Sequence, residues 1–210
     1  MQLNSIIIKA ACFAAKAHED QRRKGSGIPY IEHPLGVAEI VANEGGVCDE
    51  ITLTAALLHD TVEDTDVTLD QIQEIFGWDL AHAVAEITDN KTARKQHQID
   101  HSRWISKRAR TIKLADKLHK LRSFATGPPN WDRERIQGYF VWSAAIIDSI
   151  RGTNRRLEDA LDVVFACNIT LGDETFPALP DCDRVEFLKQ YMESMRVAVD
   201  GGFNPEVREN

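Results

Sequence analysis

The sequence lacks three features that would place it in common functional classes. Its four cysteines form no CxxC pair, which excludes a zinc knuckle or dithiol redox motif of that spacing. No hydrophobic run is long enough to span a bilayer, and the N-terminal stretch has no basic leader region. Basic residues are outnumbered, 25 against 33 acidic ones. The net charge of −8 argues against a nucleic-acid polymer or an anionic membrane as partner, and we expect a cytoplasmic protein.

Apolar residues recur at helical spacing in nearly every segment of the 210 residues, and no strand-helix-strand rhythm is visible. The pattern predicts an all-α fold, a compact orthogonal helical bundle. Capping residues, Gly and Pro mark the helix ends. We expect helices over residues 6–17, 34–44, 51–64, 69–76, 78–88, 105–124, 132–150 and 153–165.

Two stretches interrupt this pattern. Residues 88–98 are polar, and we expect a loop or the end of a helix there. Residues 170–182 are rich in Pro, Gly and acids, which is typical of a linker. We therefore predict a main domain over residues 1–166 and an extension over residues 167–210. The extension consists of the linker, one helix over 183–199 and a loose tail.

The segment ALLHDTVEDTD gathers an imidazole and several carboxylates at the end of an apolar helix. On one continuous helix, His59 and Glu63 are four residues apart, as are Asp60 and Asp64. Acids at a helix C-terminus oppose the helix dipole, at a cost of about 0.3–1 kcal/mol each. A divalent cation would relieve this repulsion. The alternative is a solvated acidic turn without a ligand.

Two further segments favour the cation. His33 follows a Gly-Pro loop in PYIEHP, and Asp116 lies within KLADKLHKLRS, among basic residues. Together with His59 and Asp60 they offer two nitrogen and two oxygen ligands. This set suits Mn, Fe, Zn or Mg rather than a thiolate-bound metal.

The segments RRKGSGIPYIEHP, AALLHDTVEDT, TDNKT, KLADKLHKLR and GTNRRLEDAL occur in this order within residues 10–165. They resemble the hydrolase domain of the RelA/SpoT family, which belongs to the HD-domain phosphohydrolases. The resemblance is greatest to the stand-alone small alarmone hydrolases of bacteria and the animal SpoT homologue. It implies a helical fold of the HD-domain type without a synthetase domain.

The resemblance also implies a role for each matching residue. His33, His59, Asp60 and Asp116 match the ligands of one divalent metal, most often Mn²⁺. Glu63 and Asp64 match the acidic pair that positions and activates the attacking water. The implied activity removes the 3′-diphosphate of guanosine tetra- or pentaphosphate as pyrophosphate. The implied partner is a small anionic nucleotide, and no sequence feature indicates an oligomeric state.

The cluster of basic residues allows two interpretations. Residues 107–122 contain seven Lys or Arg and a single acid, Asp116, in a chain that is acidic overall. This favours a helix that partly faces phosphate, and the alternative is a solvated face whose stems cover apolar surface. Together with the resemblance, it makes the following residues candidates for substrate binding: Arg23, Lys24, Ser26, Lys91, Lys95, Lys113, Lys120, Arg135 and Tyr139.

One position departs from the family pattern. Many relatives have Asn where this chain has Lys120, which replaces a two-way hydrogen-bonding amide by a cation that only donates. The identity of the substrate therefore stays open between a guanosine alarmone, an adenosine 3′-diphosphate and NADPH. The animal homologue is also associated with removal of the 2′-phosphate of NADPH. A non-catalytic nucleotide sensor is a third alternative.

Overall fold

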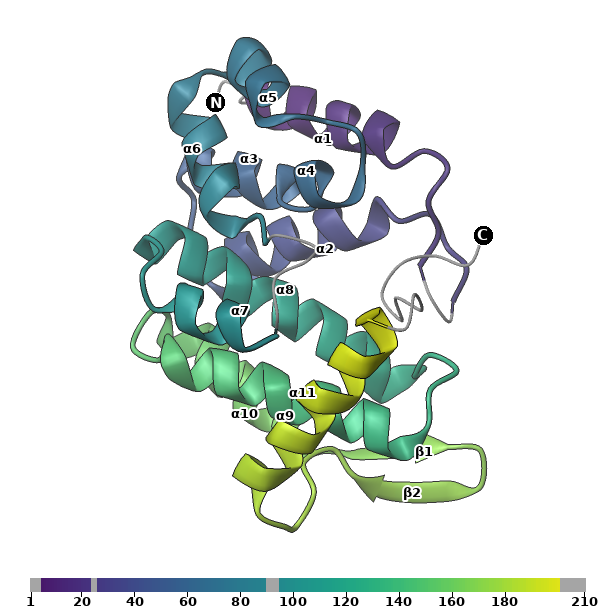
Figure 1. Cartoon of the computed structure of the whole chain (residues 1–210). Coiled ribbons are helices and arrows are strands. Elements are labelled where there is room, and N and C mark those ends of the chain that lie inside the picture. The colour runs from purple at the N-terminus through teal and green to yellow at the C-terminus, as the bar shows by residue number, and fades with distance from the viewer. Residues whose placement is uncertain (1–4, 24–25, 90–94, 201–210) are drawn as a thin grey trace.

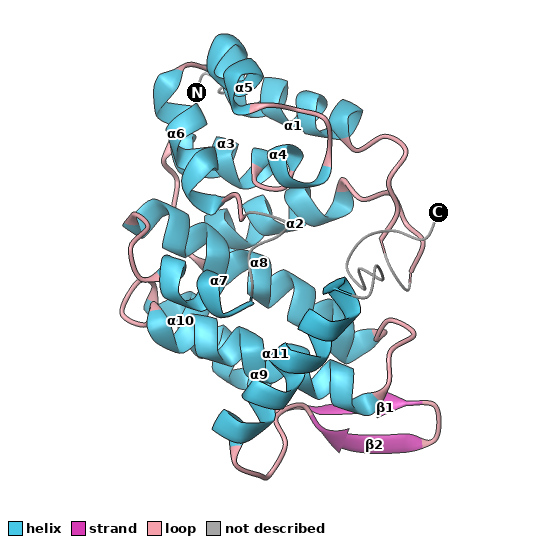
Figure 2. Ribbon diagram, viewed as in Figure 1, coloured by secondary structure: helices cyan, strands magenta, loops and turns pink. Residues whose placement is uncertain are grey.

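The computed structural model describes residues 5–23, 26–89 and 95–200 of the chain. Helices make up almost all the regular structure of this part, and one two-stranded hairpin is the exception (Figure 2), so the all-α prediction is confirmed. The helices are α1 Ser5–Ala17, α2 Glu32–Glu39, α3 Glu50–Leu58, α4 Thr61–Asp64, α5 Leu69–Phe76, α6 Trp78–Ile87, α7 Lys95–Ser102, α8 Lys107–Thr126, α9 Arg133–Ser149, α10 Arg155–Phe165 and α11 Arg184–Asp200, with a π-helical turn η1 Ile40–Glu44 after α2.

Local side-chain hydrogen bonds explain where several helices begin. Asp49 caps α3, where its carboxylate accepts the Thr52 N–H at 3.0 Å. Thr68 and Gln71 form the capping box that their spacing predicts, at the start of α5. Asp132 caps α9 in the same way. Each cap satisfies a backbone donor that has no partner within the helix, which is why these starts were predictable to within one or two residues.

Helix α8 lies at the centre of the molecule (Figure 1). It packs against α2, α3, α6, α9, α10 and the first strand. Ser106 caps it and is itself held by Glu86, whose carboxylate accepts its N–H at 2.9 Å and its hydroxyl at 2.6 Å. Half of its twenty residues are buried, including Lys113, Asp116 and Lys117. A basic helix with this burial brings charged groups into the interior of the fold.

The predicted helix over 51–64 is two helices, and the prediction of one continuous helix was wrong. Helix α3 ends at Leu58 and α4 begins at Thr61, so that His59 and Asp60 lie at the break, although both keep right-handed helical dihedral angles. Two side chains satisfy carbonyls there: Thr61 Oγ1 donates to Leu58 O at 2.7 Å, and His59 Nδ1 donates to Ala56 O at 2.8 Å. Glu63 and Asp64 consequently lie in the first turn of α4 rather than in the last turn of a long helix.

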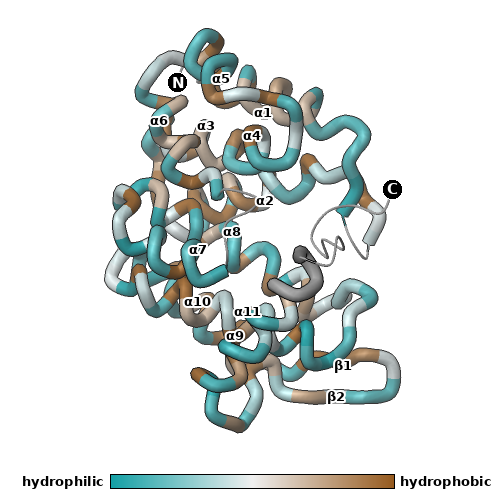
Figure 3. Tube along the Cα trace, viewed as in Figure 1, coloured by the Kyte–Doolittle hydropathy of each residue, from teal (hydrophilic) through white to brown (hydrophobic). Residues whose placement is uncertain are grey.

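The polar stretch 88–98 also differs from the prediction, because α7 already begins at Lys95. The connection from α1 to α2 is hydrophilic over most of its length (Figure 3). No helix of the described ranges combines the length and hydropathy needed to cross a bilayer.

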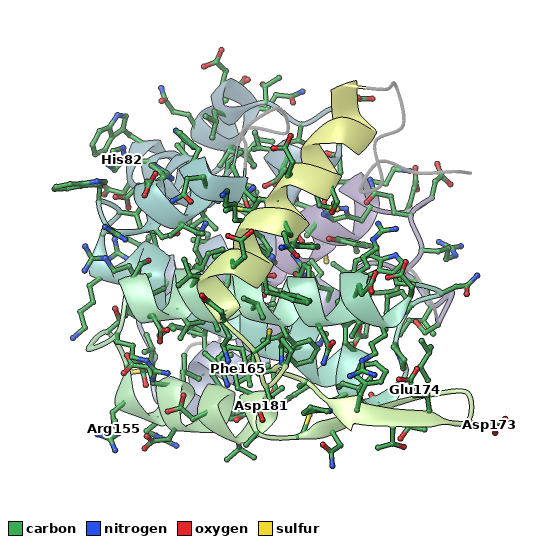
Figure 4. The ribbon with its side chains drawn as sticks, turned by 60° about the horizontal axis from the view of Figure 1, so that its bottom comes forward. His82, Arg155, Phe165, Asp173, Glu174 and Asp181 are labelled. Carbon is green, nitrogen blue, oxygen red and sulfur yellow. The ribbon has the colours of Figure 1, made fainter. Side chains whose placement is uncertain are left out.

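A β-hairpin occupies most of the predicted linker. Strand β1 Asn168–Leu171 pairs antiparallel with β2 Glu174–Pro177 through a turn at Gly172, whose φ of +60° favours glycine. Ile169 and Phe176 pair across the strands and are buried, whereas Thr175 faces solvent. Asp173 and Glu174 lie at the turn (Figure 4). Two buried residues in four-residue strands are too few to give a recognisable alternation, which explains why the sequence did not reveal the hairpin.

Helix α11 follows the hairpin and agrees with the helix predicted over 183–199. Strand β1 contacts α8 and α11 lies across α9, so both parts of the extension pack on the main body. The boundary between residues 166 and 167 stays a prediction. The predicted tail, residues 201–210, lies outside the described residues.

We predict that the hairpin is part of the core. Phe176→Ala should lower the free energy of unfolding by about 3–5 kcal/mol, because it leaves a cavity where a buried ring was. Thr175→Ala, on the exposed face of the same strand, should change it by less than about 0.5 kcal/mol. Urea denaturation followed by circular dichroism measures both values. If Phe176→Ala also changed the free energy of unfolding by less than about 0.5 kcal/mol, the hairpin would contribute no packing to the core.

Candidate active site

Three separate segments contribute the four predicted metal ligands. His33 comes from the first turn of α2, His59 and Asp60 from the break between α3 and α4, and Asp116 from the middle of α8. All four residues are buried, with between 0% and 8% of their surface exposed. The contacts of α8 with α2 and α3 bring these segments together.

The ligand atoms converge on one point. His33 Nε2 lies 3.3 Å from Asp60 Oδ2 and 3.1 Å from Asp116 Oδ1. His59 Nε2 lies 3.1 Å from Asp60 Oδ2 and 3.7 Å from Asp116 Oδ1. One ligand atom from each of His33, His59 and Asp60 lies within 4.8 Å of the other two, which is close enough for all three to hold one metal ion. The structure therefore places all four predicted ligands in one cluster.

Hydrogen bonds orient both imidazoles with Nε2 toward this point. His59 Nδ1 must carry a proton, because its partner is the Ala56 carbonyl oxygen, which only accepts. His33 Nδ1 lies 3.0 Å from His119 Nδ1, and His119 Nε2 lies 3.2 Å from Glu32 Oε1. If His33 Nδ1 donates to His119 Nδ1, a neutral His119 carries its own proton on Nε2, next to the Glu32 carboxylate. This assignment leaves a lone pair on each ligand Nε2.

Those lone pairs point at carboxylates, which is unfavourable without a cation. Among the described residues, neither His33 Nε2 nor His59 Nε2 has a hydrogen-bond partner of acceptable geometry, and both atoms are buried. In the absence of a metal, a proton can take its place. Although burial opposes the charge, the neighbouring Asp60 and Asp116 raise the pKa of His59 to about 10. The residues present thus fit a bound cation, and their donor set suits a divalent metal.

The acidic pair lies beside the cluster. Burial, with the charges of Asp60 and Asp64, raises the pKa of Glu63 to about 7. Its Oε2 accepts the Asp89 N–H at 3.2 Å. The Tyr30 hydroxyl lies 2.7 Å from Asp60 Oδ2 and 3.2 Å from Asp64 Oδ2, so it ties a ligand carboxylate to the acidic pair. A carboxyl group with a pKa near neutrality suits proton transfer.

Three of the seven basic residues of α8, Lys113, Lys117 and Lys120, lie beside acids of the candidate site. Lys113 is 4% exposed and pairs with Asp89 at 2.9 Å. Lys120 Nζ lies 2.8 Å from Asp116 Oδ1, and Lys117 Nζ lies 3.7 Å from Asp116 Oδ2. Although burial opposes it, Asp116 and Asp60 keep the pKa of Lys120 well above its ordinary value. This favours the interpretation of α8 as a helix that lines the site.

The other predicted substrate-binding residues lie in several places. Arg23 donates to Ser123 Oγ at 2.8 Å and lies 3.5 Å from Glu32, which links it to the His119 network. Ser26 is exposed in the loop before α2. The Arg135 guanidinium stacks over Trp131 at 4.0 Å.

Lys95 and Tyr139 lie together in an aromatic cluster. Tyr139 is buried, and Lys95 Nζ lies 5.9 Å from its ring and 3.8 Å from that of Trp142. The predicted Lys24 and Lys91 lie outside the described residues.

Sequence reasoning did not assign three residues that contact this set: Tyr30, His119 and Lys117. Each lies in a motif that carries a predicted ligand. Tyr30 lies three residues before His33 in PYIEHP, and Lys117 and His119 follow Asp116 within KLADKLHKLR. The contact of His119 with His33 depends on how α2 packs against α8, and those of Tyr30 with Asp60 and Asp64 join segments about thirty residues apart, which no local pattern specifies.

A hollow of about 870 Å³ lies elsewhere, between the start of α9, the hairpin and the start of α11. None of the described residues predicted for the site lines it. Arg133, which does, pairs with Glu174 at 2.7 Å. The chemistry of the buried cluster, rather than the size of this hollow, identifies the candidate site.

Comparison with known proteins agrees with this geometry. The model of the HD-domain family matches residues 10–139. The guanosine-3′,5′-bis(diphosphate) 3′-pyrophosphohydrolase MESH1 of Xenopus tropicalis is 47% identical over 167 residues, which are 77% of this chain and 93% of that protein. The human MESH1 protein is 47% identical over 165 residues, covering 76% of this chain and 92% of its own length.

A solved structure shows the same fold. It is described as a metazoan orthologue of SpoT that hydrolyses ppGpp and plays a role in starvation responses. It matches with a TM-score of 0.76 and 40% identity, over 79% of this chain and 96% of that one. The chain therefore belongs to the HD-domain family, in the branch that contains the MESH1 proteins and the metazoan SpoT orthologue.

Proposed function

We propose that this chain is a stand-alone metal-dependent hydrolase that removes the 3′-diphosphate of guanosine-3′,5′-bis(diphosphate) as pyrophosphate, leaving GDP. Its MESH1 relatives are named for this activity, and the chain spans more than nine tenths of their length. The observation that supports the proposal most directly is the convergence of two imidazole nitrogens and two carboxylates beside Glu63. A cytoplasmic location and the lack of a nucleic-acid or membrane partner stay predictions.

We assign His33, His59, Asp60 and Asp116 as the ligands of one divalent metal. Mn²⁺ is our choice among the metals that suit two nitrogens and two oxygens. When bound there, the metal polarises a phosphoryl oxygen and lowers the pKa of a coordinated water.

The chain's own residues supply the rest of the reaction. Water attacks the phosphorus next to the ribose, the bond from that phosphorus to the 3′-oxygen breaks, and the 3′-oxygen takes up a proton. Glu63 accepts the proton of the attacking water, and Asp64, held by Tyr30, orients that water. Lys113 and Lys120 stabilise the charge that develops on the phosphoryl oxygens. The other predicted substrate-binding residues remain candidates for holding the nucleotide.

Removal of a ligand tests this function. Asp60→Ala should abolish pyrophosphate release and lower the bound metal well below one ion per chain, because three ligands remain and two buried imidazoles lose their shared carboxylate. Circular dichroism should stay that of a helical protein. Pyrophosphate release from ppGpp with Mn²⁺, and metal content by mass spectrometry, are the measurements.

Asp66→Ala is the matched control, because Asp66 is exposed in the same acidic segment. It should leave release and metal content unchanged. Undiminished release by the Asp60→Ala protein would contradict the assignment, and a wild-type chain that releases no pyrophosphate from ppGpp with any divalent metal would contradict the function.

Glu63→Gln should separate chemistry from metal binding. The turnover number kcat should fall by about 10²–10⁴-fold, the usual contribution of a positioned base. Metal content should stay at the wild-type level, because Glu63 is not a ligand in this assignment. Loss of the metal together with the activity would instead place Glu63 among the ligands.

The same variant should stabilise the metal-free protein at high pH. The folded-state pKa of Glu63, about 7, lies above its ordinary value of 4.5, so the folded chain binds the proton more tightly. Glu63 thus lowers stability progressively as pH rises between these two values. The melting temperature of Glu63→Gln should equal that of the wild type near pH 4 and exceed it above pH 7. A constant difference across this range would show that Glu63 has an ordinary pKa.

Lys120 gives a specific reason to test other nucleotides. Its ammonium lies beside Asp116, where it offers donors only. Lys120→Asn should raise kcat/KM for ppGpp relative to the adenosine 3′-diphosphate analogue and NADPH, because an amide can both donate to and accept from a guanine edge. A panel of these three substrates, assayed with Mn²⁺, measures the ratio. An unchanged ratio would show that Lys120 does not select the base.

A further inference from the structure

The imidazole of His33, on α2, lies between two residues of α8. Its Nε2 is 3.1 Å from Asp116 Oδ1, and its Nδ1 is 3.0 Å from His119 Nδ1. Asp116 and His119 are three residues apart, so they lie on the same face of α8. Helix α8 therefore supplies one assigned metal ligand and, about one turn later, the side chain that contacts the far nitrogen of another.

The hydrogen bond between the two imidazoles holds a single proton. One Nδ1 donates it and the other accepts it, because a protonated ring nitrogen has no free lone pair. If His33 donates, its Nε2 keeps the lone pair that a metal needs. If His119 donates, a neutral His33 must carry its own proton on Nε2, in the place of the metal. A proton there would have no acceptor of acceptable geometry among the described residues.

The Glu32 carboxylate favours the arrangement in which His33 donates. Glu32 Oε1 lies 3.2 Å from His119 Nε2, where it attracts the proton of His119 and leaves Nδ1 of that ring as an acceptor. Arg23 lies 3.5 Å from the other oxygen, Oε2, and donates to Ser123 Oγ at 2.8 Å. The carboxylate is thus held by a second partner, although the Glu32 side chain is 46% exposed.

The place of the His119 ring depends on Gly36, which follows His33 by three residues in α2. A Cβ atom added at Gly36 would lie 2.2 Å from His119 Nε2 and 2.4 Å from its Cδ2. Non-bonded heavy atoms pack at about 3.5–4.0 Å, so any larger residue at this position would displace the ring. The contact between His119 and His33 therefore belongs to a specific close packing of α2 on α8.

We propose that His119 is a positioning residue for the metal site. Its Nδ1 accepts the His33 proton, which keeps His33 Nε2 available for the metal, and Glu32 selects the tautomer of His119 that can accept. The inference rests on the metal-ligand assignment within the proposed function. It concerns metal affinity and is independent of which nucleotide the chain cleaves.

Binding of Mn²⁺ to the metal-free full chain, measured by isothermal titration calorimetry, tests this role without turnover. His119→Leu removes the acceptor and should weaken Mn²⁺ binding about 10–100-fold, the usual effect of losing the partner of a ligand. His119→Asn places an amide oxygen near the position of Nδ1 and should bind Mn²⁺ within about threefold of the wild type. Wild-type affinity in His119→Leu, or an equal loss in His119→Asn, would overturn the inference.

A double-mutant cycle tests the selection by Glu32. Glu32→Ala should weaken Mn²⁺ binding about two- to fivefold in the wild type, less than His119→Leu does, because Glu32 is partly exposed. It should have no effect in His119→Asn, whose amide oxygen accepts without a choice of ring tautomer. An equal loss in both backgrounds would mean that Glu32 acts through its charge alone, and would overturn the selection.

Glu39→Ala is the matched control, because it removes the same charge from an exposed position of the same helix, where Glu39 bonds Asn43. It should leave the affinity unchanged. Pyrophosphate release from ppGpp is measured separately. A wild type that binds Mn²⁺ but releases no pyrophosphate would contradict the proposed function alone, and the binding series would still decide the role of His119. A wild type that binds no Mn²⁺ would overturn the inference together with the ligand assignment.

Discussion

The structure depends on a buried arrangement that is unfavourable on its own. Each of two imidazole nitrogens lies 3.1–3.7 Å from an oxygen of each of two carboxylates, inside the bundle. Burying this many polar and charged groups is costly, and neither His33 Nε2 nor His59 Nε2 has a hydrogen-bond partner among the described residues. A cation removes the conflict. Two features of the fold create this buried arrangement. They are the break between α3 and α4 and the central position of α8.

Orientation of the two imidazoles is achieved by different means. His59 is held by a backbone carbonyl one turn earlier, so its tautomer follows from the helix itself. His33 depends on His119 and, through it, on Glu32, which is partly exposed and also lies near Arg23. Gly36 makes room for His119, since a Cβ there would lie 2.2 Å from its Nε2. One ligand is thus anchored rigidly, and the other connects the cluster to the loop before α2.

Sequence patterns predicted what depends on local chemistry. Caps predicted at Asp49 and Thr68, with the helical periodicity, gave the starts of two helices. The motif residues include the four predicted ligands, which the structure brings together. Patterns failed at one local feature and at one that depends on tertiary packing. The break at His59 and Asp60 is stabilised by side-chain bonds to α3 carbonyls, and the hairpin at Ile169 and Phe176 exists because the core offers a place for two side chains.

The lysines of α8 show why burial was needed to interpret the charge pattern. Seven basic residues within 107–122 are compatible with a solvated face and with a phosphate-facing one, and Asp116 in their midst favours the second. Lys113 and Lys117 are four residues apart, and Lys117 and Lys120 are three apart. This spacing places the three side chains on one face of the helix. Each pairs with a carboxylate of the site, at Asp89 or Asp116. In a protein that is acidic overall, these three ammonium groups place positive charge beside the carboxylates of the candidate site.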